Sequence, residues 1–131
     1  MKIGVVCTSF HKKEIDKMLY FVQSESNDQN IELSEIVWVP GAMEIPLALD
    51  RMLQSNNLIG AIALGIIEKG ETQHGLVMGQ SVVSSIIDLQ LKYNKPIGLG
   101  IIGPGAKPEH IGPRLESHAK AALNAIIQMS N

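Results

Sequence analysis

Short apolar runs alternate with longer amphipathic ones along the chain, and this alternation limits the possible folds more than any other feature. The short runs, which we interpret as strands, lie at residues 3–7, 31–37, 58–64 and 95–101. The first of them shows no polar alternation, which is typical of a strand covered on both faces. Strands that alternate with helices predict a parallel sheet wrapped on both sides, because each right-handed crossover places its helix over one face.

We therefore expect an α/β chain that folds as a three-layer αβα sandwich, flavodoxin-like, with a four-stranded parallel sheet. The longest helix is predicted from about residue 74 to residue 93, and further helical pieces are predicted within residues 108–129. We expect a single domain over residues 1–131, because 131 residues suffice to bury roughly two thirds of the surface of the unfolded chain.

The composition excludes some partners and favours self-association. Charged residues make up 18% of the chain, below the usual roughly 25%, so we expect partner subunits to cover part of the surface. The net charge is −2 and Lys and Arg do not cluster with aromatic residues, which argues against nucleic acid. No apolar run reaches the roughly 18 residues of a membrane span, and the N-terminus begins as a strand rather than a signal peptide. The single cysteine, Cys7, favours a reducing, cytoplasmic location.

The segment LGIIEKGETQH at residues 64–74 links the third strand to the long helix and predicts an anion site. Gly70 permits a tight turn, and the following amides lie at the helix N-terminus, where unpaired donors and the helix dipole attract anions. Thr72 can cap this helix or donate its hydroxyl to a phosphate. A plain N-cap explains the loop equally well when the loop is taken alone.

His74 is expected one turn into the same helix. An imidazole titrates near neutrality unless its surroundings shift it, so this side chain can pass protons to a substrate held by the loop. A surface histidine without a role in catalysis is the alternative, and it is the commoner one for an isolated histidine.

The segment VPGAMEIP at residues 39–46 repeats this layout after the second strand. Glu44 is expected in the first helical turn, where its charge complements the helix dipole. As a functional residue it can accept hydrogen bonds from the hydroxyls of a polyol.

Arg114 lies in a polar C-terminal segment that is typical of a solvated helix face. The alternative is a phosphate contact, because a guanidinium can hold two phosphate oxygens at once.

Other side chains that can carry chemistry predict no further site. The histidines at positions 11, 110 and 118 lack a compact metal-ligand spacing and no cysteine pair accompanies them, so we expect no metal site. Cys7 is interpreted as a core residue rather than a nucleophile. The loop at residues 70–74 is neither a Gly-x-Gly-x-x-Gly motif nor a Walker motif, which argues against dinucleotides and nucleoside triphosphates.

Taken together, four segments closely resemble the lumazine synthase family: residues 39–46, 64–65, 70–74 and 95–101. The resemblance covers nearly the whole chain. The short termini and the loop at residues 103–105 resemble the archaeal branch of that family. Within these segments, Met43 stands where the family has Phe, and Leu99 where it has an aromatic residue.

The resemblance implies an enzyme of riboflavin biosynthesis that needs neither a cofactor nor a metal. Such enzymes join a ribitylamino-pyrimidinedione to a dihydroxybutanone phosphate, giving dimethyl-ribityllumazine, phosphate and water. The substrate-binding residues that the resemblance implies are Phe10, Ala42, Met43, Glu44, Ile66, Ile67 and Leu99. The implied phosphate-binding residues are Gly70, Glu71, Thr72 and Arg114, the last from a neighbouring subunit.

In this family-based interpretation Phe10 stacks on the heterocycle, and Met43 and Glu44 contact the ribityl chain. Backbone groups of Ile66 and Ile67 hold the ring edge, and His74 moves protons. A second cation near the phosphate can be His118 or Lys120.

The family forms pentamers, sometimes packed into sixty-subunit shells, so the resemblance implies a homopentamer or a larger assembly. Two rival functions stay open. One is an archaeal-type riboflavin synthase, which dismutates two lumazines and needs no phosphate site. The other is a non-catalytic module that binds flavin or phosphate or forms a shell.

Overall fold

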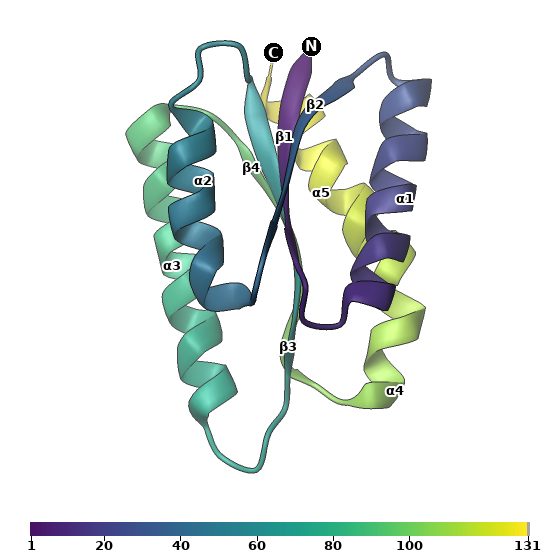
Figure 1. The fold of residues 1–131 in the computed structure, drawn as a ribbon, viewed down its shortest axis with the longest axis vertical. Coiled ribbons are helices and arrows are strands. Elements are labelled where there is room, and N and C mark those ends of the chain that lie inside the picture. Colours follow the sequence, from purple (N-terminus) through teal and green to yellow (C-terminus); the bar gives the residue numbers. More distant parts are fainter. Residues whose placement is uncertain (131) are drawn as a thin grey trace.

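A four-stranded, all-parallel sheet forms the middle layer of the computed structural model, which describes residues 1–130 (Figure 1). The strand order is β2-β1-β3-β4. The strands are β1 (Lys2–Thr8), β2 (Glu32–Val39), β3 (Gly60–Glu68) and β4 (Ile97–Ala106). The predicted α/β class and the four-stranded parallel sheet are therefore confirmed.

Helices cover both faces of this sheet (Figure 1). One face carries α1, α4 and α5, and the other carries α2 and α3. Their bounds are α1 (Lys12–Asp28), α2 (Ile45–Leu53), α3 (His74–Tyr93), α4 (Pro108–Ile111) and α5 (Leu115–Met129), with short 3₁₀ turns η1 (Ala42–Glu44) and η2 (Gly112–Arg114). None of the helices within residues 1–130 combines the length and the apolar character needed to cross a membrane.

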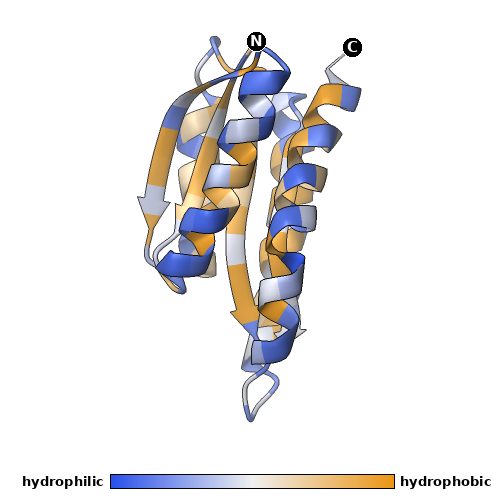
Figure 2. Cartoon of the chain, turned by 90° about the vertical axis from the view of Figure 1, so that its right-hand side faces the viewer, coloured by the Kyte–Doolittle hydropathy of each residue, from blue (hydrophilic) through white to orange (hydrophobic). Residues whose placement is uncertain are grey.

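The core consists of two apolar layers, one between each face of the sheet and its helices. Strand side chains alternate between them: Val5 and Cys7 lie in the layer under α1 and α5, and Val6 lies in the layer under α2 and α3. Figure 2 shows the matching pattern on α1 and α5, whose outward faces are hydrophilic while the strands behind them are hydrophobic. A buried strand on both faces needs such runs of apolar residues.

Cys7 belongs to this core, as predicted. Its side chain has no exposed surface, and burial raises the pKa of its thiol to about 12, with a smaller contribution from the Asp16 carboxylate that the Lys12 ammonium opposes. A thiol with so high a pKa is a poor nucleophile at neutral pH.

Of the four strands, β3 and β4 extend furthest beyond their predicted ends. β3 continues four residues past Leu64 to Glu68, and β4 includes residues 103–105, which were predicted to form a loop. The reason is an irregular pairing between the two strand ends: Glu68 pairs with Ala106 after a register shift, and the Lys69 amide donates to the Ala106 carbonyl at 2.8 Å. β4 is an edge strand, where proline and bulge-like irregularities are tolerated.

Candidate active site

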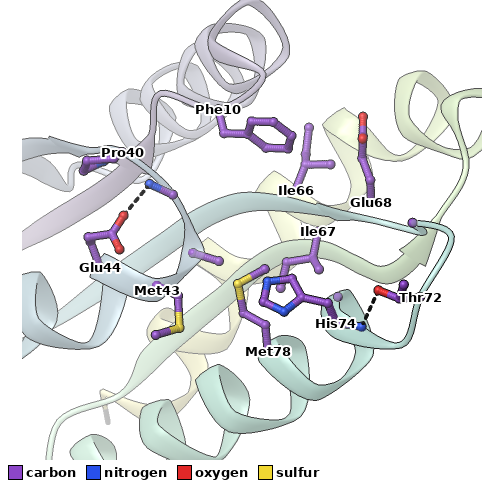
Figure 3. Close-up of a pocket in the computed structure, with 14 residues that line it drawn as sticks. Phe10, Pro40, Met43, Glu44, Ile66, Ile67, Glu68, Thr72, His74 and Met78 are labelled. Carbon is purple, nitrogen blue, oxygen red and sulfur yellow. Dashed lines mark hydrogen bonds between the residues drawn. The ribbon is translucent and has the colours of Figure 1, made fainter.

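A cleft of about 550 Å³ opens at the carboxyl ends of β1, β2 and β3 (Figure 3). Ligand sites of parallel α/β sheets lie at this edge, because the loops that leave the strands converge there. The residues that line the cleft are Phe10, Pro40, Gly41, Ala42, Met43, Glu44, Ile66, Ile67, Glu68, Gly70, Thr72, His74, Gly75 and Met78. Nine of the predicted site residues are among them: Phe10, Ala42, Met43, Glu44, Ile66, Ile67, Gly70, Thr72 and His74.

Phe10 forms one wall of the cleft, and its side chain is half exposed. Its backbone is fixed, because its amide donates to the Pro40 carbonyl at 3.1 Å and its carbonyl accepts from Thr8 Oγ1 at 3.3 Å. The aromatic ring lies on the same side of β3 as Ile66 (Figure 3). The floor is apolar, since Ile66 and Ile67 are both almost fully buried. A flat, apolar heterocycle fits between such a wall and floor.

Glu44 lies at the junction of η1 and α2, not in the first turn of the α-helix as predicted. Its Oε1 accepts a hydrogen bond from the Gly41 amide at 2.9 Å, which fixes the turn that follows β2 (Figure 3). Within residues 1–130 its Oε2 has no hydrogen-bond partner. The turn therefore presents one carboxylate oxygen that can accept a hydroxyl hydrogen.

The loop before α3 brings Gly70 and Thr72 to the cleft beside His74. His74 is the first residue of α3, where the helix was predicted to begin and not one turn into it, and its amide donates to Thr72 Oγ1 at 3.3 Å. Thr72 thus caps the helix start, although the residue at the N-cap position is Gln73. A Cβ atom at Gly70 would meet none of the described atoms within 4 Å, so the space above this loop is open. Open space above amides at a helix N-terminus suits an anion.

Glu71 does not face the cleft. It lines a neighbouring hollow of about 410 Å³, which Gly70, Thr72 and Glu68 also border. The two spaces thus meet along the loop at residues 69–73. A phosphate above the loop would lie at their shared border.

Arg114 and Leu99 lie outside the cleft of a single protomer. Arg114 borders a separate hollow of about 220 Å³ together with His110 and His118, and its Nη1 donates to the His110 carbonyl at 2.9 Å. Leu99 is part of the edge strand β4 and is 43% exposed. Lys120 Nζ lies 3.5 Å from Glu116 Oε2 on the exposed side of α5.

Five residues that line the cleft were missed: Pro40, Gly41, Glu68, Gly75 and Met78. The signal for Glu68 was present, because the β-branched pair at residues 66–67 continues the strand run beyond Gly65. Gly75 is needed where α3 approaches β3, since a Cβ atom there would lie 2.8 Å from the Glu68 carbonyl oxygen. Among residues 1–130, no three His, Cys, Asp or Glu side chains lie close enough together to hold a metal ion.

The chain is similar to known proteins of one family. The model of the family described as 6,7-dimethyl-8-ribityllumazine synthase matches residues 1–131. A protein of that name from Staphylothermus marinus is 35% identical over 130 residues, which cover 99% of this chain and 87% of that protein. Homologues of the same name from Metallosphaera sedula and Saccharolobus solfataricus are 35% and 33% identical, covering 99% and 98% of this chain and 86% and 84% of theirs.

Proposed function

The chain belongs to the 6,7-dimethyl-8-ribityllumazine synthase family and is a transferase of riboflavin biosynthesis, and from this premise we propose that its two substrates react in the cleft between Phe10 and His74. The reaction condenses 5-amino-6-(D-ribitylamino)uracil with 3,4-dihydroxy-2-butanone 4-phosphate and releases phosphate and water. One observation carries the assignment of residues: groups suited to a flat ring, a polyol and a phosphate line a single cleft.

The pyrimidine occupies the apolar part of the cleft. Phe10 stacks on the heterocycle, and backbone groups of Ile66 and Ile67 hold its edge. The ribityl chain runs toward residues 42–44, where Glu44 Oε2 accepts hydrogen bonds from its hydroxyls. The half-exposed ring of Phe10 and the unpaired Oε2 atom support this placement.

The phosphate of the second substrate lies over residues 70–72. The amides at the start of α3 and the Thr72 hydroxyl donate to it, and the helix dipole favours its charge. The open space above Gly70 supports this assignment. Once phosphate has left, the same donors can hold it as a product.

His74 passes protons between the reacting groups, because its imidazole lines the cleft beside the phosphate loop (Figure 3). The amine of the first substrate attacks the ketone of the second and water leaves to form an imine. Phosphate is then eliminated from the imine, and the ring closes with loss of water. Holding two reactants in a productive geometry can remove about 7–11 kcal/mol of the barrier, whereas a proton shuttle contributes about 10²–10⁴-fold. Most of the acceleration therefore comes from positioning.

The working form is a homopentamer or a larger assembly in which Arg114 and Leu99 come from a neighbouring copy. Both lie outside the cleft of their own protomer, and apolar side chains on the exposed faces of α2 and α3 support contacts between copies. These side chains are Leu47, Leu76, Val77, Ile87 and Leu91.

The second basic residue beside Arg114 is His118 rather than Lys120, because His118 borders the same hollow. A cytoplasmic location, which the single Cys7 favours, stays a prediction.

Incubation of the purified protein with both substrates tests the function. We expect inorganic phosphate and dimethyl-ribityllumazine in equal amounts, the latter followed by its fluorescence. No phosphate above the uncatalysed background would contradict the proposal. Conversion of lumazine alone to riboflavin would instead support the riboflavin synthase alternative. Sizing in solution tests the assembly, and a stable, active monomer would contradict the shared site.

A further inference from the structure

His11 and Glu68, which lie at the ends of different elements, meet beside the cleft. His11 immediately precedes α1 and Glu68 is the last residue of β3. Nε2 of His11 is a buried atom, and Glu68 Oε1 lies directly against it. On the other side of the ring, Nδ1 lies 3.8 Å from Glu14 Oε2. The imidazole is thus enclosed by two carboxylates, of which the Glu68 carboxylate is the nearer.

The Glu68 side chain points toward the α1 side of β3 because of its register in the strand. Side chains alternate along a strand, so Ile66 and Glu68 share one face while Ile67 takes the other. Figure 3 shows the Glu68 carboxylate on the same side of β3 as Phe10, with Thr72 and His74 on the opposite side. As the terminal residue of the strand, Glu68 nevertheless borders the cleft and also the hollow along residues 69–73.

A carboxylate in this position weakens the binding of an anion if it turns toward the loop at residues 70–72. Only Lys69 separates Glu68 from Gly70, the first residue of the phosphate loop. The Glu68 side chain is 40% exposed, so space exists for it to turn toward the loop. At such short range, repulsion between the Glu68 carboxylate and the substrate phosphate would weaken phosphate binding several-fold, because the cleft walls reduce screening by solvent.

The imidazole that faces Glu68 is itself fixed by its surroundings. His11 adopts the left-handed conformation with φ 59°, which histidine, asparagine and aspartate tolerate better than other side chains. The Phe10 ring meets the imidazole edge-on, with centroids 4.5 Å apart and an interplanar angle of 75°. Only 23% of the His11 side chain is exposed. The position of the imidazole is therefore fixed by its neighbours, and Nε2 meets Glu68 Oε1 as an ion-pair contact without the geometry of a hydrogen bond.

We propose that His11 is a positioning residue: it holds the Glu68 carboxylate on the Phe10 side of β3 and so keeps that charge away from the substrate phosphate. This inference rests on the proposed function, since it assigns the phosphate to residues 70–72. His11 does not touch the reacting atoms. Its effect on phosphate binding passes through Glu68.

Steady-state kinetics of three variants test the proposal. His11→Asn removes the imidazole but keeps a residue that accepts the left-handed backbone. We expect the KM for the phosphate substrate to rise about threefold to tenfold, with kcat within about twofold of wild type. Glu68→Gln removes the charge and should leave that KM unchanged or lower. The double variant should return it to the wild-type value, because no carboxylate is then left to repel phosphate.

The rescue separates positioning from a merely structural role. A structural defect of His11→Asn would lower kcat or the melting temperature, and Glu68→Gln would not repair it. An unchanged KM in His11→Asn, or a raised KM that persists in the double variant, would overturn the inference. The inhibition constant of inorganic phosphate should likewise rise in His11→Asn and return to the wild-type value in the double variant. A wild-type protein that releases no phosphate from the substrates would contradict the proposed function instead, which keeps the two failures distinct.

Discussion

The Tyr93 hydroxyl donates a 2.7 Å hydrogen bond to Asp50 Oδ1 and so ties the end of α3 to α2. Lys92 Nζ reaches the same oxygen at 2.9 Å. The opposite, N-terminal ends of these two helices carry His74 and Glu44. Fixing one end of the helix pair therefore helps to fix the spacing of the site residues at the other end.

Asp50→Asn should destabilise the protein at neutral pH but not in acid. Hydrogen bonds from Lys92 and Tyr93 hold the pKa of Asp50 below its usual value. A carboxyl group with a lowered pKa in the folded state stabilises the fold above its unfolded pKa of about 4, and this contribution is lost as the pH falls through the folded pKa. Melting temperatures of wild type and Asp50→Asn should therefore differ at pH 7 and converge in acid.

Asp16→Asn provides the control for this measurement, because Asp16 pairs with Lys12 within one helix, at 3.0 Å, and joins no two elements. Its effect at pH 7 should be smaller. A constant difference between wild type and Asp50→Asn from neutral to acid pH would show that the charge of Asp50 does not act through this network.

Gly98→Ala should destabilise the fold by about 1–3 kcal/mol through overpacking. A Cβ atom at Gly98 on β4 would collide with the Ala122 carbonyl group on α5, which is backbone and cannot turn away. The shift in the midpoint of urea unfolding measures the effect, at one protein concentration because assembly contributes to stability. Gly112→Ala is the matched control, since a Cβ atom there would meet none of the described atoms within 4 Å. Equal midpoints for both variants would refute the packing argument.

The fold could be predicted from the sequence because its signals are local and agree with one another. Four strand-like runs and the intervening helical stripes specify a parallel sheet with two covered faces, and the start of α3 at His74 matches the predicted position. The β-branched residues 66–67 signalled that β3 continues past Leu64, but the end of β4 could not be predicted, because residues 103–105 signal a turn locally. Pairing between Glu68 and Ala106 overrides that signal, and pairing is a long-range property.

The candidate site could likewise be predicted from the sequence only in part. Most residues that line the cleft lie at the carboxyl ends of strands or in the turns that follow them, so their convergence follows from the order of the elements. The contact between His11 and Glu68 could not be predicted, because it depends on the true end of β3 and on the backbone conformation at His11. Arg114 and Leu99 lie outside the cleft of one protomer, and the sequence of a single chain carries no pattern that places one copy against another.

Arg114→Ala should raise the KM for the phosphate substrate about tenfold and change kcat little, because it removes the charge-assisted hydrogen bond that we propose between Arg114 and the substrate. The KM for the pyrimidine should stay within about twofold, since that substrate carries no phosphate. Arg51, the other arginine of the chain, is exposed on α2 and serves as the control: Arg51→Ala should leave both KM values unchanged. An unchanged KM for the phosphate substrate in Arg114→Ala would indicate that the Arg114 side chain is solvated and does not contact the substrate.

His74→Ala should slow turnover by up to about 10²-fold without abolishing it, because a proton shuttle supplies only part of the acceleration and positioning supplies the rest. His74→Gln is the matched variant: it keeps polar contacts at the start of α3 but cannot exchange a proton, so its kcat should fall equally. Both KM values should stay within about threefold of wild type, since the phosphate donors and the Phe10 wall are intact. Turnover as fast as wild type in either variant at every pH would remove His74 from the mechanism. A fall in kcat confined to His74→Ala would assign His74 a role in the shape of the loop instead.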